Sequence, residues 1–331
     1  MNEPPTTPGD SIIIVNWNSA DYLLRCLASI FQEHEAREWE IIVVDNASND
    51  NCEELLRRQF PEVRFLATGV NLGFARANNA GYSISCAESV LFLNPDTEVL
   101  GPAVSQLAEY LQDHPQIGAV GPQLLNSDGS PQFSCIQAFP TILNQVLDCE
   151  ALRRAFPRSK LWGMRPLFDP HCTPAEVDSI SGACFMVRRS VFEKAGRFSE
   201  EYFMYSDDLD LSYKIRAAGY KIVYLPYCCV THYGGKSSEQ QSSGFADVLQ
   251  CQSMDYFFRK TRGATYGVAY RSAMAGVAVL RLVAAMCLLP LSAIGGLKWG
   301  PTVTLTKWFA ILRWAAGQES WAGAIGRRAD A

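Results

Sequence analysis

The sequence predicts an α/β domain built on a mostly parallel central sheet, and three observations carry this prediction. Short apolar runs rich in Ile and Val alternate with segments of helical spacing through the first third of the chain. This alternation is typical of βαβ units, in which a helix follows each strand. Polar residues follow three of the apolar runs directly, as in sheets that bind ligands at the carboxyl ends of their strands. The chain has 331 residues, 48% of them hydrophobic, and can therefore bury a sizeable core.

The strands are predicted from apolar runs of strand length, which suit strands that are buried on both faces. In the first third of the chain they are expected at residues 11–17, 40–45, 63–66 and 90–93. Apolar residues at helical spacing predict helices between them, at residues 21–31, 51–59 and 74–86. Further along, we expect a strand pair within 179–188, a helix at 207–218 and a last strand at 221–225, whereas 121–178 is rich in loop signals.

The C-terminal segment differs from the rest of the chain in charge and hydropathy. Residues 259–331 hold ten Lys and Arg against two acids, a net charge of +8, within a chain whose total is −5. An apolar run at 272–297 precedes a second helical pattern at 303–316. In that pattern, aromatic residues alternate with basic ones, namely Lys307, Trp308, Arg313 and Trp314. This arrangement favours an anionic membrane interface, with a true span of the bilayer and simple packing on the protein as alternatives.

Composition and missing motifs exclude several classes of function. A net charge of −5 argues against nucleic acid as a partner. The sequence contains no G-x-G-x-x-G, which argues against an NAD-type Rossmann protein, and no G-x-x-x-x-G-K-[ST], which argues against a P-loop enzyme. The eleven cysteines include no C-x-x-C and several lie in apolar runs, so we expect them to be reduced, as in a cytosolic protein.

Asp96 is the first candidate metal ligand, because it follows an apolar strand in the segment LFLNPDT. A carboxylate at that point could hold a Mg²⁺ or Mn²⁺ ion that binds a diphosphate, since both ions prefer oxygen ligands and phosphates. The alternative is a purely structural Asn-Pro-Asp turn. His232, in VTHYGG beyond the last strand, is a second candidate ligand, although a lone histidine is more often structural.

Three acids, Asp207, Asp208 and Asp210, open the helix predicted at 207–218, and we refer to them as the acid motif. Asp207 and Asp210 have the spacing of a capping box, so one or both could cap the helix. Capping does not explain Asp208, whose apolar neighbours could raise its pKa, as a general base requires. The pattern alone leaves both interpretations, catalysis and capping, open.

The polar residues after the strands could line a nucleotide pocket. They form the clusters 16–18, 45–48 and 94–97. Asp45 ends the second predicted strand, and its carboxylate could accept the N–H of a pyrimidine or a ribose hydroxyl. The segment 71–81, NLGFARANNAG, supplies glycines for close backbone approach and amide side chains for hydrogen bonds.

Seven short segments together resemble glycosyltransferase family 2, and within it the rhamnosyltransferase-like branch of bacterial cell-surface polysaccharide synthesis. They occur in the family's order over about 225 residues, and their number and order make the resemblance specific. The segments are IIIVNWNS (12–19), IIVVDNASND (41–50), NLGFARANNAG (71–81), LFLNPDT (91–97), SGACFMVRR (181–189), FMYSDDLDL (203–211) and THYGG (231–235).

The resemblance implies a GT-A fold, which is a Rossmann-like domain that binds a nucleoside-diphosphate sugar, and a divalent cation, either Mg²⁺ or Mn²⁺. Asp45 would contact the pyrimidine base. Asp96 and His232 would bind the metal, and the acid motif would supply the catalytic base, Asp208. The other residues expected to bind the nucleotide are Asn16, Asn46, Asn71, Gly73, Asn79 and Asn94.

The sequence departs from the family's pattern at three places. Asn94 replaces the first acid of the D-x-D motif, which is usual in this branch. Asp207 replaces the more frequent Glu of a Glu-Asp pair and is shorter by one methylene. Residues 196–200 read GRFSE where the branch usually has G-G-F-D-E, so Arg197 replaces a Gly and Ser199 replaces an Asp. This departure bears on contacts with the acceptor.

We therefore expect an inverting hexosyltransferase of cell-surface polysaccharide synthesis. By resemblance, it would move rhamnose from dTDP-rhamnose to a saccharide or a lipid-linked saccharide. Inversion follows from a single displacement, since no motif supplies a second carboxylate for a double one. The alternatives are transfer from a UDP-sugar (galactofuranose, glucose or galactose) and a non-catalytic subunit that binds sugar nucleotides. A processive synthase is disfavoured, because the sequence has no Q-x-x-R-W motif.

The expected organisation has three parts. They are a disordered lead-in at 1–10, a GT-A domain at 11–240 and a C-terminal helical region at 241–331. The C-terminal region would bring the enzyme to a membrane surface. We accordingly expect the protein in the cytoplasm, at the cytoplasmic face of the bacterial inner membrane.

Overall fold

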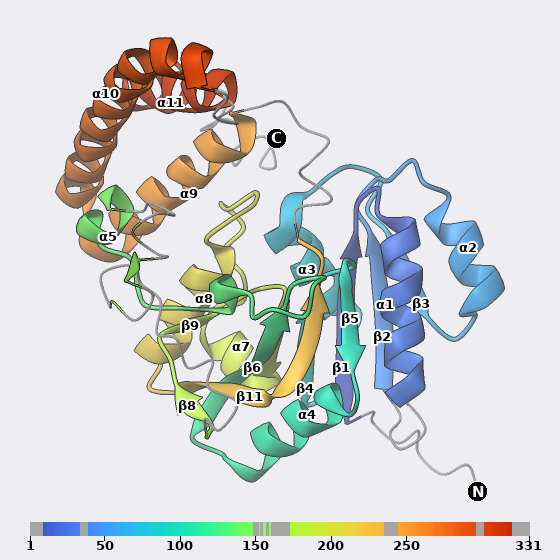
Figure 1. Ribbon diagram of the computed structural model, residues 1–331. Coiled ribbons are helices and arrows are strands. Elements are labelled where there is room, and N and C mark those ends of the chain that lie inside the picture. The colour runs from blue at the N-terminus through green and yellow to red at the C-terminus, as the bar shows by residue number, and fades with distance from the viewer. Residues whose placement is uncertain are drawn as a thin grey trace, which may run out of the picture.

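The computed structural model describes residues 9–33, 39–147, 173–234, 244–295 and 301–319, together with residues 152, 155, 156 and 159. It has two parts, an α/β body around a central sheet and an arch of C-terminal helices beside it (Figure 1). Residues 1–8 of the expected lead-in, and Gly235 of the last quoted motif, lie outside the described residues.

The central sheet has nine strands, most of which run in one direction. The strands are β1 (Asp10–Asn16), β2 (Trp39–Asp45), β3 (Arg64–Ala67), β4 (Ser89–Leu93), β5 (Thr97–Leu100), β6 (Ile117–Leu125), β8 (Ala175–Glu176), β10 (Cys184–Arg188) and β11 (Lys221–His232). Their order is β3-β2-β1-β4-β10-β6-β11-β5, with β8 paired to β11. Only β5, β8 and β10 run against the others. The predicted α/β structure with a mostly parallel sheet is thereby confirmed.

The helices of the body follow the predicted alternation with the strands. They are α1 (Ala20–Glu33), α2 (Cys52–Gln59), α3 (Gly73–Ile84), α4 (Ala103–Asp113), α5 (Ile142–Val146), α7 (Arg189–Lys194) and α8 (Asp207–Ala217). A short helix η2 (Phe133–Cys135) precedes β7 (Ile136–Gln137), which pairs with β9 (Ser179–Ile180) in a second small sheet. In α1, the buried residues Leu23, Leu27 and Ile30 recur at helical spacing and therefore face the core.

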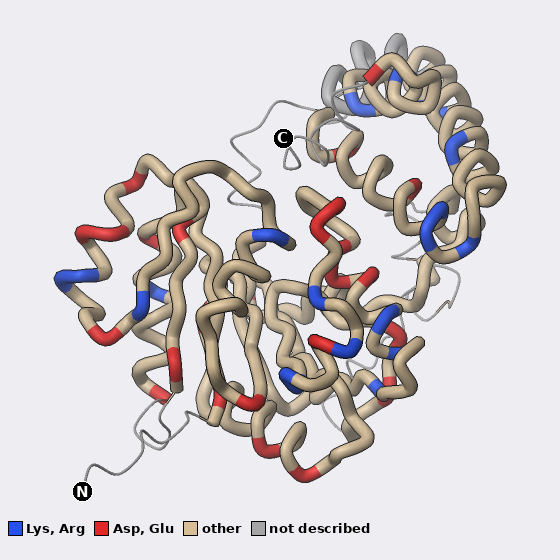
Figure 2. Tube along the Cα trace, turned by 180° about the vertical axis from the view of Figure 1, so that it is seen from behind, with Lys and Arg blue, Asp and Glu red and all other residues tan. Residues whose placement is uncertain are grey.

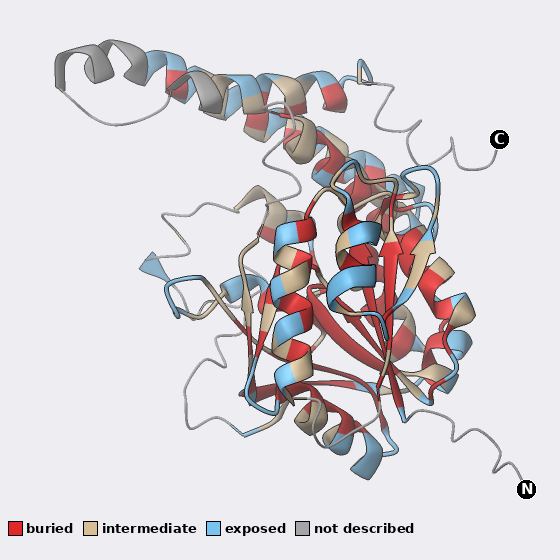
Figure 3. Cartoon of the chain, turned by 90° about the vertical axis from the view of Figure 1, so that its right-hand side faces the viewer, coloured by how far each residue is buried: buried red, intermediate tan, exposed pale blue. Residues whose placement is uncertain are grey.

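The core lies around the central strands β1, β2 and β4, which are almost fully buried (Figure 3). β1 is buried along its whole length, as the run of three isoleucines predicts. β1 also lies between β2 and β4, so the chain crosses from one side of β1 to the other. Such a switch opens a crevice at the carboxyl ends of the strands, where sheets of this kind bind ligands.

The segment 121–178 was expected to be rich in loops, yet its start belongs to the central strand β6. Gly118, Gly121 and Pro122 interrupt the apolar pattern of this strand and conceal it. The glycines allow close packing, since a Cβ on Gly121 would lie 2.9 Å from the side chain of Ile180. The last strand, β11, continues past a shift of register between Leu225 and Cys229 and ends at His232.

The arch consists of α9 (Phe245–Arg262), α10 (Ala264–Gly295) and α11 (Pro301–Ala315). These helices share a hydrophobic cluster that also includes Tyr202 and Leu209 of the body. The cluster buries Trp308 and Trp314, of which Trp314 is 0% exposed and donates to Gln252 over 2.8 Å. The expectation that these two tryptophans lie at a membrane interface is therefore wrong, because they pack inside the arch.

Within the described part of the chain, one helical segment, Ala264–Cys287, is long and apolar enough to cross a membrane. Only 22% of its most apolar window is buried inside the protein. A single helix of this kind also occurs in proteins that do not span a membrane, so the segment alone does not establish a span.

Candidate active site

The polar ends of β1 and β2 are in direct contact. Asn16, the last residue of β1, is aligned with Asp45, the last residue of β2. Asn16 is fully buried, and its Nδ2 donates to Asp45 Oδ1 over 3.2 Å. The other oxygen of Asp45 accepts the backbone N–H of Ser48 over 3.2 Å. Two residues that the sequence assigned to the nucleotide pocket are thus held together at the crevice.

Asp50 is a residue of this region that the sequence reasoning missed. Its Oδ2 accepts from Asn16 Nδ2 over 3.1 Å and from the N–H of Ala20, where α1 begins, over 2.9 Å. Asp50 therefore stabilises the N-terminus of α1, because the N–H groups of the first turn have no partner within the helix. Asp45, Asp50 and Cys52 lie close enough to share an ion, but burial raises the pKa of the Cys52 thiol to about 12. Both carboxylates accept bonds from Asn16 Nδ2, so they join the ends of β1 and β2.

Asn46, Asn71 and Gly73 form a second predicted group that the structure brings together. Asn46 Nδ2 donates to Asn71 Oδ1 over 3.0 Å, and Asn46 Oδ1 accepts the N–H of Leu72 over 2.8 Å. Gly73 has a φ of +78°, and a Cβ there would lie 2.5 Å from the carbonyl oxygen of Phe203. Only glycine fits this position, and the tight contact joins the segment to the loop that precedes the acid motif.

Asn79 is not part of either group. It is buried on α3, where its Nδ2 donates to the Phe198 carbonyl over 3.0 Å and to Glu200 over 3.1 Å. Its Oδ1 accepts the Phe198 N–H over 3.2 Å. Because both ends of the amide are engaged with this loop, Asn79 positions residues 198–200, and the structure does not bring it to the crevice.

Asp96 and His232 lie together beyond β4 and at the end of β11. The His232 Nε2 is 3.4 Å from Asp96 Oδ1 and 3.4 Å from the Nδ2 of Asn94. The backbone of Tyr233 adds a bond from its N–H to the Asp96 carbonyl over 2.9 Å. His232 is thus in contact with both Asn94 and Asp96, although it lies 138 residues beyond Asn94 in the sequence.

Gln132 orients the imidazole and was not predicted. Its Oε1 lies 2.7 Å from His232 Nδ1, while its Nε2 donates to Asn126 Oδ1 over 3.3 Å. The bond from Gln132 Nε2 sets the orientation of the amide, so Gln132 Oε1 accepts the proton of His232 Nδ1, and His232 Nε2 faces Asp96. An imidazole nitrogen and a carboxylate oxygen thus point at each other from two separate strand ends. Because oxygen and imidazole donors suit Mn²⁺, these residues fit a divalent cation.

Within the acid motif, burial raises the pKa of both Asp207 and Asp208. Asp208 Oδ2 accepts the N–H of Gly182 over 2.8 Å, and Oδ1 accepts the N–H of Leu209 over 2.7 Å. Burial raises the pKa of Asp208, whereas these two bonds lower it. Asp207 Oδ2 has no hydrogen-bond partner among the described residues, and burial together with the Asp208 charge raises the pKa of Asp207 to about 8. Asp207 therefore keeps its proton at neutral pH.

Asp210 does not cap α8, so the capping interpretation is wrong for this residue. Its carboxylate is fully buried, accepts a bond from Ser199 Oγ over 2.6 Å and pairs with Lys260 Nζ at 3.0 Å. The N-terminus of α8 follows Ser206, which also makes no side-chain capping bond. Asp210 instead connects α8 to the loop that contains Ser199 and to α9.

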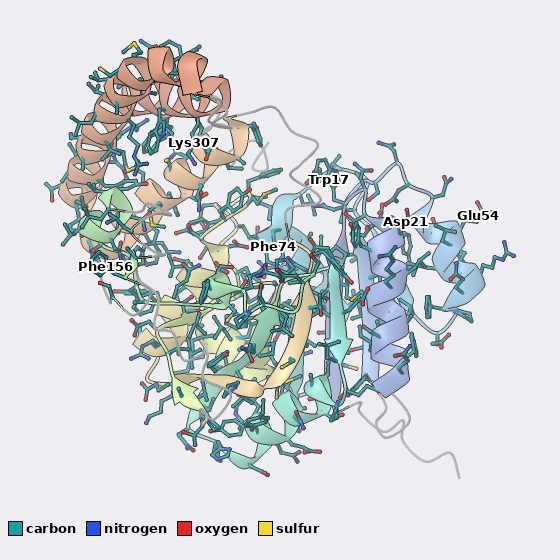
Figure 4. The ribbon with its side chains drawn as sticks, in the orientation of Figure 1. Trp17, Asp21, Glu54, Phe74, Phe156 and Lys307 are labelled. Carbon is teal, nitrogen blue, oxygen red and sulfur yellow. The ribbon has the colours of Figure 1, made fainter. Side chains whose placement is uncertain are left out.

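Backbone contacts bring these separate parts around one region. The Asn94 N–H donates to the Ala183 carbonyl over 2.9 Å, one residue from the glycine that binds Asp208. The Phe74 N–H, at the start of α3, donates to the Phe203 carbonyl over 2.9 Å. Figure 4 shows Phe74 at the middle of the body, near α3 and α8. The nucleotide side, the metal side and the acid motif are therefore connected through short backbone segments.

Sequence comparisons agree with this arrangement. The family model described as "Glycosyl transferase family 2" matches residues 11–196, and the model "Glycosyl transferase family group 2" matches residues 171–316. The N-acetylglucosaminyl-diphospho-decaprenol L-rhamnosyltransferase of Mycobacterium tuberculosis is 31% identical over 241 residues, which are 69% of this chain and 76% of that protein. A rhamnosyltransferase of Escherichia coli is 22% identical over 231 residues, covering 67% of this chain and 82% of that protein.

Solved structures agree on the fold. A mannosyltransferase from Pyrobaculum calidifontis, in complex with GDP-Man and Mn²⁺, matches with a TM-score of 0.58 at 19% identity, over 96% of this chain and 89% of that one. GalNAc-T7 with UDP, GalNAc and Mn²⁺ matches with a TM-score of 0.53 at 16% identity, over 78% of this chain and 53% of that one. These likenesses confirm the GT-A fold, and together with the family models they show that the chain is a glycosyltransferase of family 2, similar to the family's rhamnosyltransferases.

Proposed function

We propose that the protein is an inverting, metal-dependent transferase that moves a hexose from a nucleoside diphosphate to a hydroxyl of a saccharide acceptor. The observation that carries this proposal is the position of Asp208. Its carboxylate is fixed by the Gly182 and Leu209 N–H groups, one residue along the backbone from the contact between Ala183 and Asn94. A carboxylate fixed in this way can act as a general base at a defined point of the crevice.

The reaction is a single displacement at the anomeric carbon. Asp208 takes the proton of the acceptor hydroxyl while the hydroxyl oxygen forms its bond to the anomeric carbon. The bond from that carbon to the diphosphate oxygen breaks with its electron pair, so the configuration inverts. Because Asp207 holds its proton at neutral pH, it places no second charge beside the base.

The donor is held on the opposite side of the crevice. Asp45 and Asn16, which are bonded to each other, would bind the base and ribose of the nucleotide, and Asn46 and Asn71 would order the adjoining loop. Asp96 and His232 would hold a divalent cation, either Mg²⁺ or Mn²⁺, which would stabilise the charge on the departing diphosphate.

For the donor we propose dTDP-rhamnose, and for the acceptor a lipid-linked saccharide. The support is the likeness to rhamnosyltransferases, one of which carries a diphospho-decaprenol acceptor in its name. A UDP-sugar is the second candidate donor. A hexosyltransferase of low-salt glycan biosynthesis from Haloferax volcanii, 29% identical over 62% of this chain and 61% of that protein, keeps the wider class of hexoses open.

A lipid-linked acceptor requires access to a membrane, and we propose that the arch supplies it at the cytoplasmic face. Exposed hydrophobic side chains recur at helical spacing along α10, namely Val268, Val279, Leu280, Val283 and Met286. Leu280 is 71% exposed. Basic residues are spread along the same helices (Figure 2), which suits an anionic surface. Membrane contact would therefore be made by this face of α10, since Trp308 and Trp314 are buried.

The base is tested with Asp208→Asn, with Asp113→Asn on the exposed end of α4 as a control of equal charge change. Release of the nucleoside diphosphate is measured with donor, Mn²⁺ and acceptor present. We expect Asp208→Asn to lower turnover by about 10²- to 10⁴-fold, as for loss of a general base, and the control to keep it. Full turnover by Asp208→Asn would refute the assignment of the base.

The donor is tested by thermal unfolding with Mn²⁺ and a panel of dTDP-, UDP- and GDP-sugars. A ligand that binds the folded state raises the Tm by an amount that grows with its concentration relative to its Kd, so at equal concentrations the donor should give the largest metal-dependent shift. A shift with dTDP-rhamnose supports the proposed donor, and a larger shift with a UDP-sugar would replace it. No shift with any nucleotide would favour a chain without transferase activity.

Membrane contact is tested by flotation with vesicles that contain anionic lipid. Leu280→Glu places a charge on the exposed hydrophobic face of α10 and should reduce binding, whereas Leu100→Glu, on the exposed edge strand β5, should not. Equal binding by both variants would show that this face does not contact the membrane.

A further inference from the structure

The turn that leads into the acid motif is strained. Tyr205 and Ser206 have φ values of +68° and +61°, and neither is a glycine. Two consecutive residues with side chains in the left-handed region raise the free energy of the backbone, so such a turn persists only where its surroundings impose it. Asp207 and Asp208 follow this turn directly, which means that its conformation decides where the base points.

One contact from the arch lies just before the turn. Ser253, on α9, is buried, and its Oγ donates to the carbonyl oxygen of Met204 over 2.9 Å. One turn further along α9, the ring of Tyr256 packs edge-on against the ring of Tyr202, with centroids 5.0 Å apart. These contacts fix the backbone on the N-terminal side of the strained turn.

A second contact from the same helix lies just after the turn. Lys260 Nζ is 3.0 Å from each oxygen of the buried Asp210 and donates to Ser199 Oγ over 2.7 Å. Lys214 pairs with the same carboxylate at 3.4 Å. Because a buried carboxylate is costly unless it is paired, Asp210 keeps its place in α8 only while its cationic partners are present.

Ser253 and Lys260 are seven residues apart, which is two helical turns, so they lie on one face of α9. The face therefore spans the strained turn from Met204 to Asp210. We propose that α9 is a positioning element of the active site, in which Ser253 and Lys260 hold the turn at Tyr205 and Ser206 so that Asp208 is aimed at the acceptor hydroxyl.

This role differs from that of a membrane anchor, although α9 belongs to the arch. The contacts of Ser253 and Lys260 involve the acid motif and the loop before it, whereas Asp45, Asp96 and His232 are held by other elements. Loss of the contacts should therefore disturb the base and leave the donor side intact. The expected signature is a change in kcat without a matching change in the KM of the donor.

The test compares Lys260→Met, Lys260→Arg and Ser253→Ala with the wild-type chain. We expect Lys260→Met to lower kcat by about 10- to 100-fold with donor KM within about twofold, since a small misplacement of a reacting group has an effect of that size. Lys260→Arg retains the charge and should recover most of the loss. Ser253→Ala removes the contact with the Met204 carbonyl and leaves the pair of Lys260 and Asp210 intact. It therefore tests the inference even if Lys260→Met does not fold.

Lys307→Met is the matched control, because it also removes a lysine that pairs with an acid on α9. Lys307 Nζ lies 2.5 Å from Asp247 Oδ1, and Figure 4 shows Lys307 high in the arch, away from Phe74. This variant should keep the kcat of the wild type. A Lys307→Met effect as large as that of Lys260→Met would show that the arch acts only through its general stability, which would overturn the inference.

Two further results would overturn it. One is an unchanged kcat in both Lys260→Met and Ser253→Ala. The other is that Lys260→Met loses kcat, donor affinity and Tm together and that Lys260→Arg restores none of them. The inference rests on the proposed role of Asp208, so Asp208→Asn is measured in the same assay. If Asp208→Asn turns over, the proposed function fails, whereas an inactive Asp208→Asn with wild-type kcat in both Lys260→Met and Ser253→Ala refutes only the role of α9.

Discussion

Replacing Asp207 by asparagine should stabilise the protein above neutral pH, although the residue belongs to the acid motif. Asp207 is buried with one carboxylate oxygen unpartnered among the described residues, beside the charge of Asp208. Its pKa of about 8 lies above its ordinary value of 3.8. The folded protein therefore binds this proton more tightly than the unfolded chain does, so ionisation of Asp207 works against folding.

The sign and size of the effect follow from this difference in pKa. The neutral carboxyl of Asp207 contributes its full stabilisation below about pH 4. This contribution falls by about 1.4 kcal/mol for each pH unit until the pH passes about 8. Between pH 6 and pH 8 the wild type should thus lose about 2 kcal/mol from this group. For a chain of 331 residues with an unfolding entropy of about 2 cal/mol/K per residue, this corresponds to about 3 °C in Tm.

The assay is thermal unfolding of the wild type and Asp207→Asn at several pH values from 5 to 9. Asparagine has no proton to lose, so the fall in Tm with pH should be about 3 °C smaller in Asp207→Asn between pH 6 and pH 8. The exposed Asp113→Asn should follow the wild type. Equal slopes for Asp207→Asn and the wild type would refute the reasoning that Asp207 keeps its proton at neutral pH.

Three other substitutions test separate parts of the structure. Gly73→Ala should destabilise the protein by about 1–3 kcal/mol and raise the donor KM, because its Cβ would clash with the Phe203 carbonyl at a positive φ; chemical unfolding and donor kinetics measure both effects. Gln132→Leu should raise the Mn²⁺ concentration needed for half-maximal activity by about 10- to 100-fold, because it releases the imidazole of His232, and an unchanged metal requirement would argue against this role. Trp314→Ala should cost about 3–5 kcal/mol in unfolding free energy, since the ring is fully buried; a loss below 1 kcal/mol in urea unfolding would mean that the arch is not packed as described.

Several features of the site were readable from local sequence. Asn16, Asp45 and Asn94 each stand at the end of an apolar run, and parallel strands bring such ends together at one edge of a sheet. In the sequence, Asp208 stood out because a capping box could account for Asp207 and Asp210 but not for Asp208. The pattern of the strands therefore predicted both the fold and the side of the sheet that carries the chemistry.

Other features depend on contacts that leave no local pattern. β6 was missed because its glycines serve to pack against Ile180 and Tyr220, and the same glycines look like loop signals in the sequence. Trp308 and Trp314 have the spacing of interfacial residues, yet they are buried in a cluster that the arch shares with Tyr202 and Leu209 of the body. In both cases the neighbours of a residue, and not its own type, decided its role.

By itself, the sequence determined the α/β class, the alternation of strands and helices and the polar clusters at the strand ends, because hydrophobic periodicity is a local property of the chain. Only the tertiary structure decided how the site is supported. Gln132 meets His232 across 100 residues, and Lys260 meets Asp210 across 50. Such pairs form only when separate elements are packed together, and a single polar side chain in a loop or on a helix carries no periodic signal of its partner.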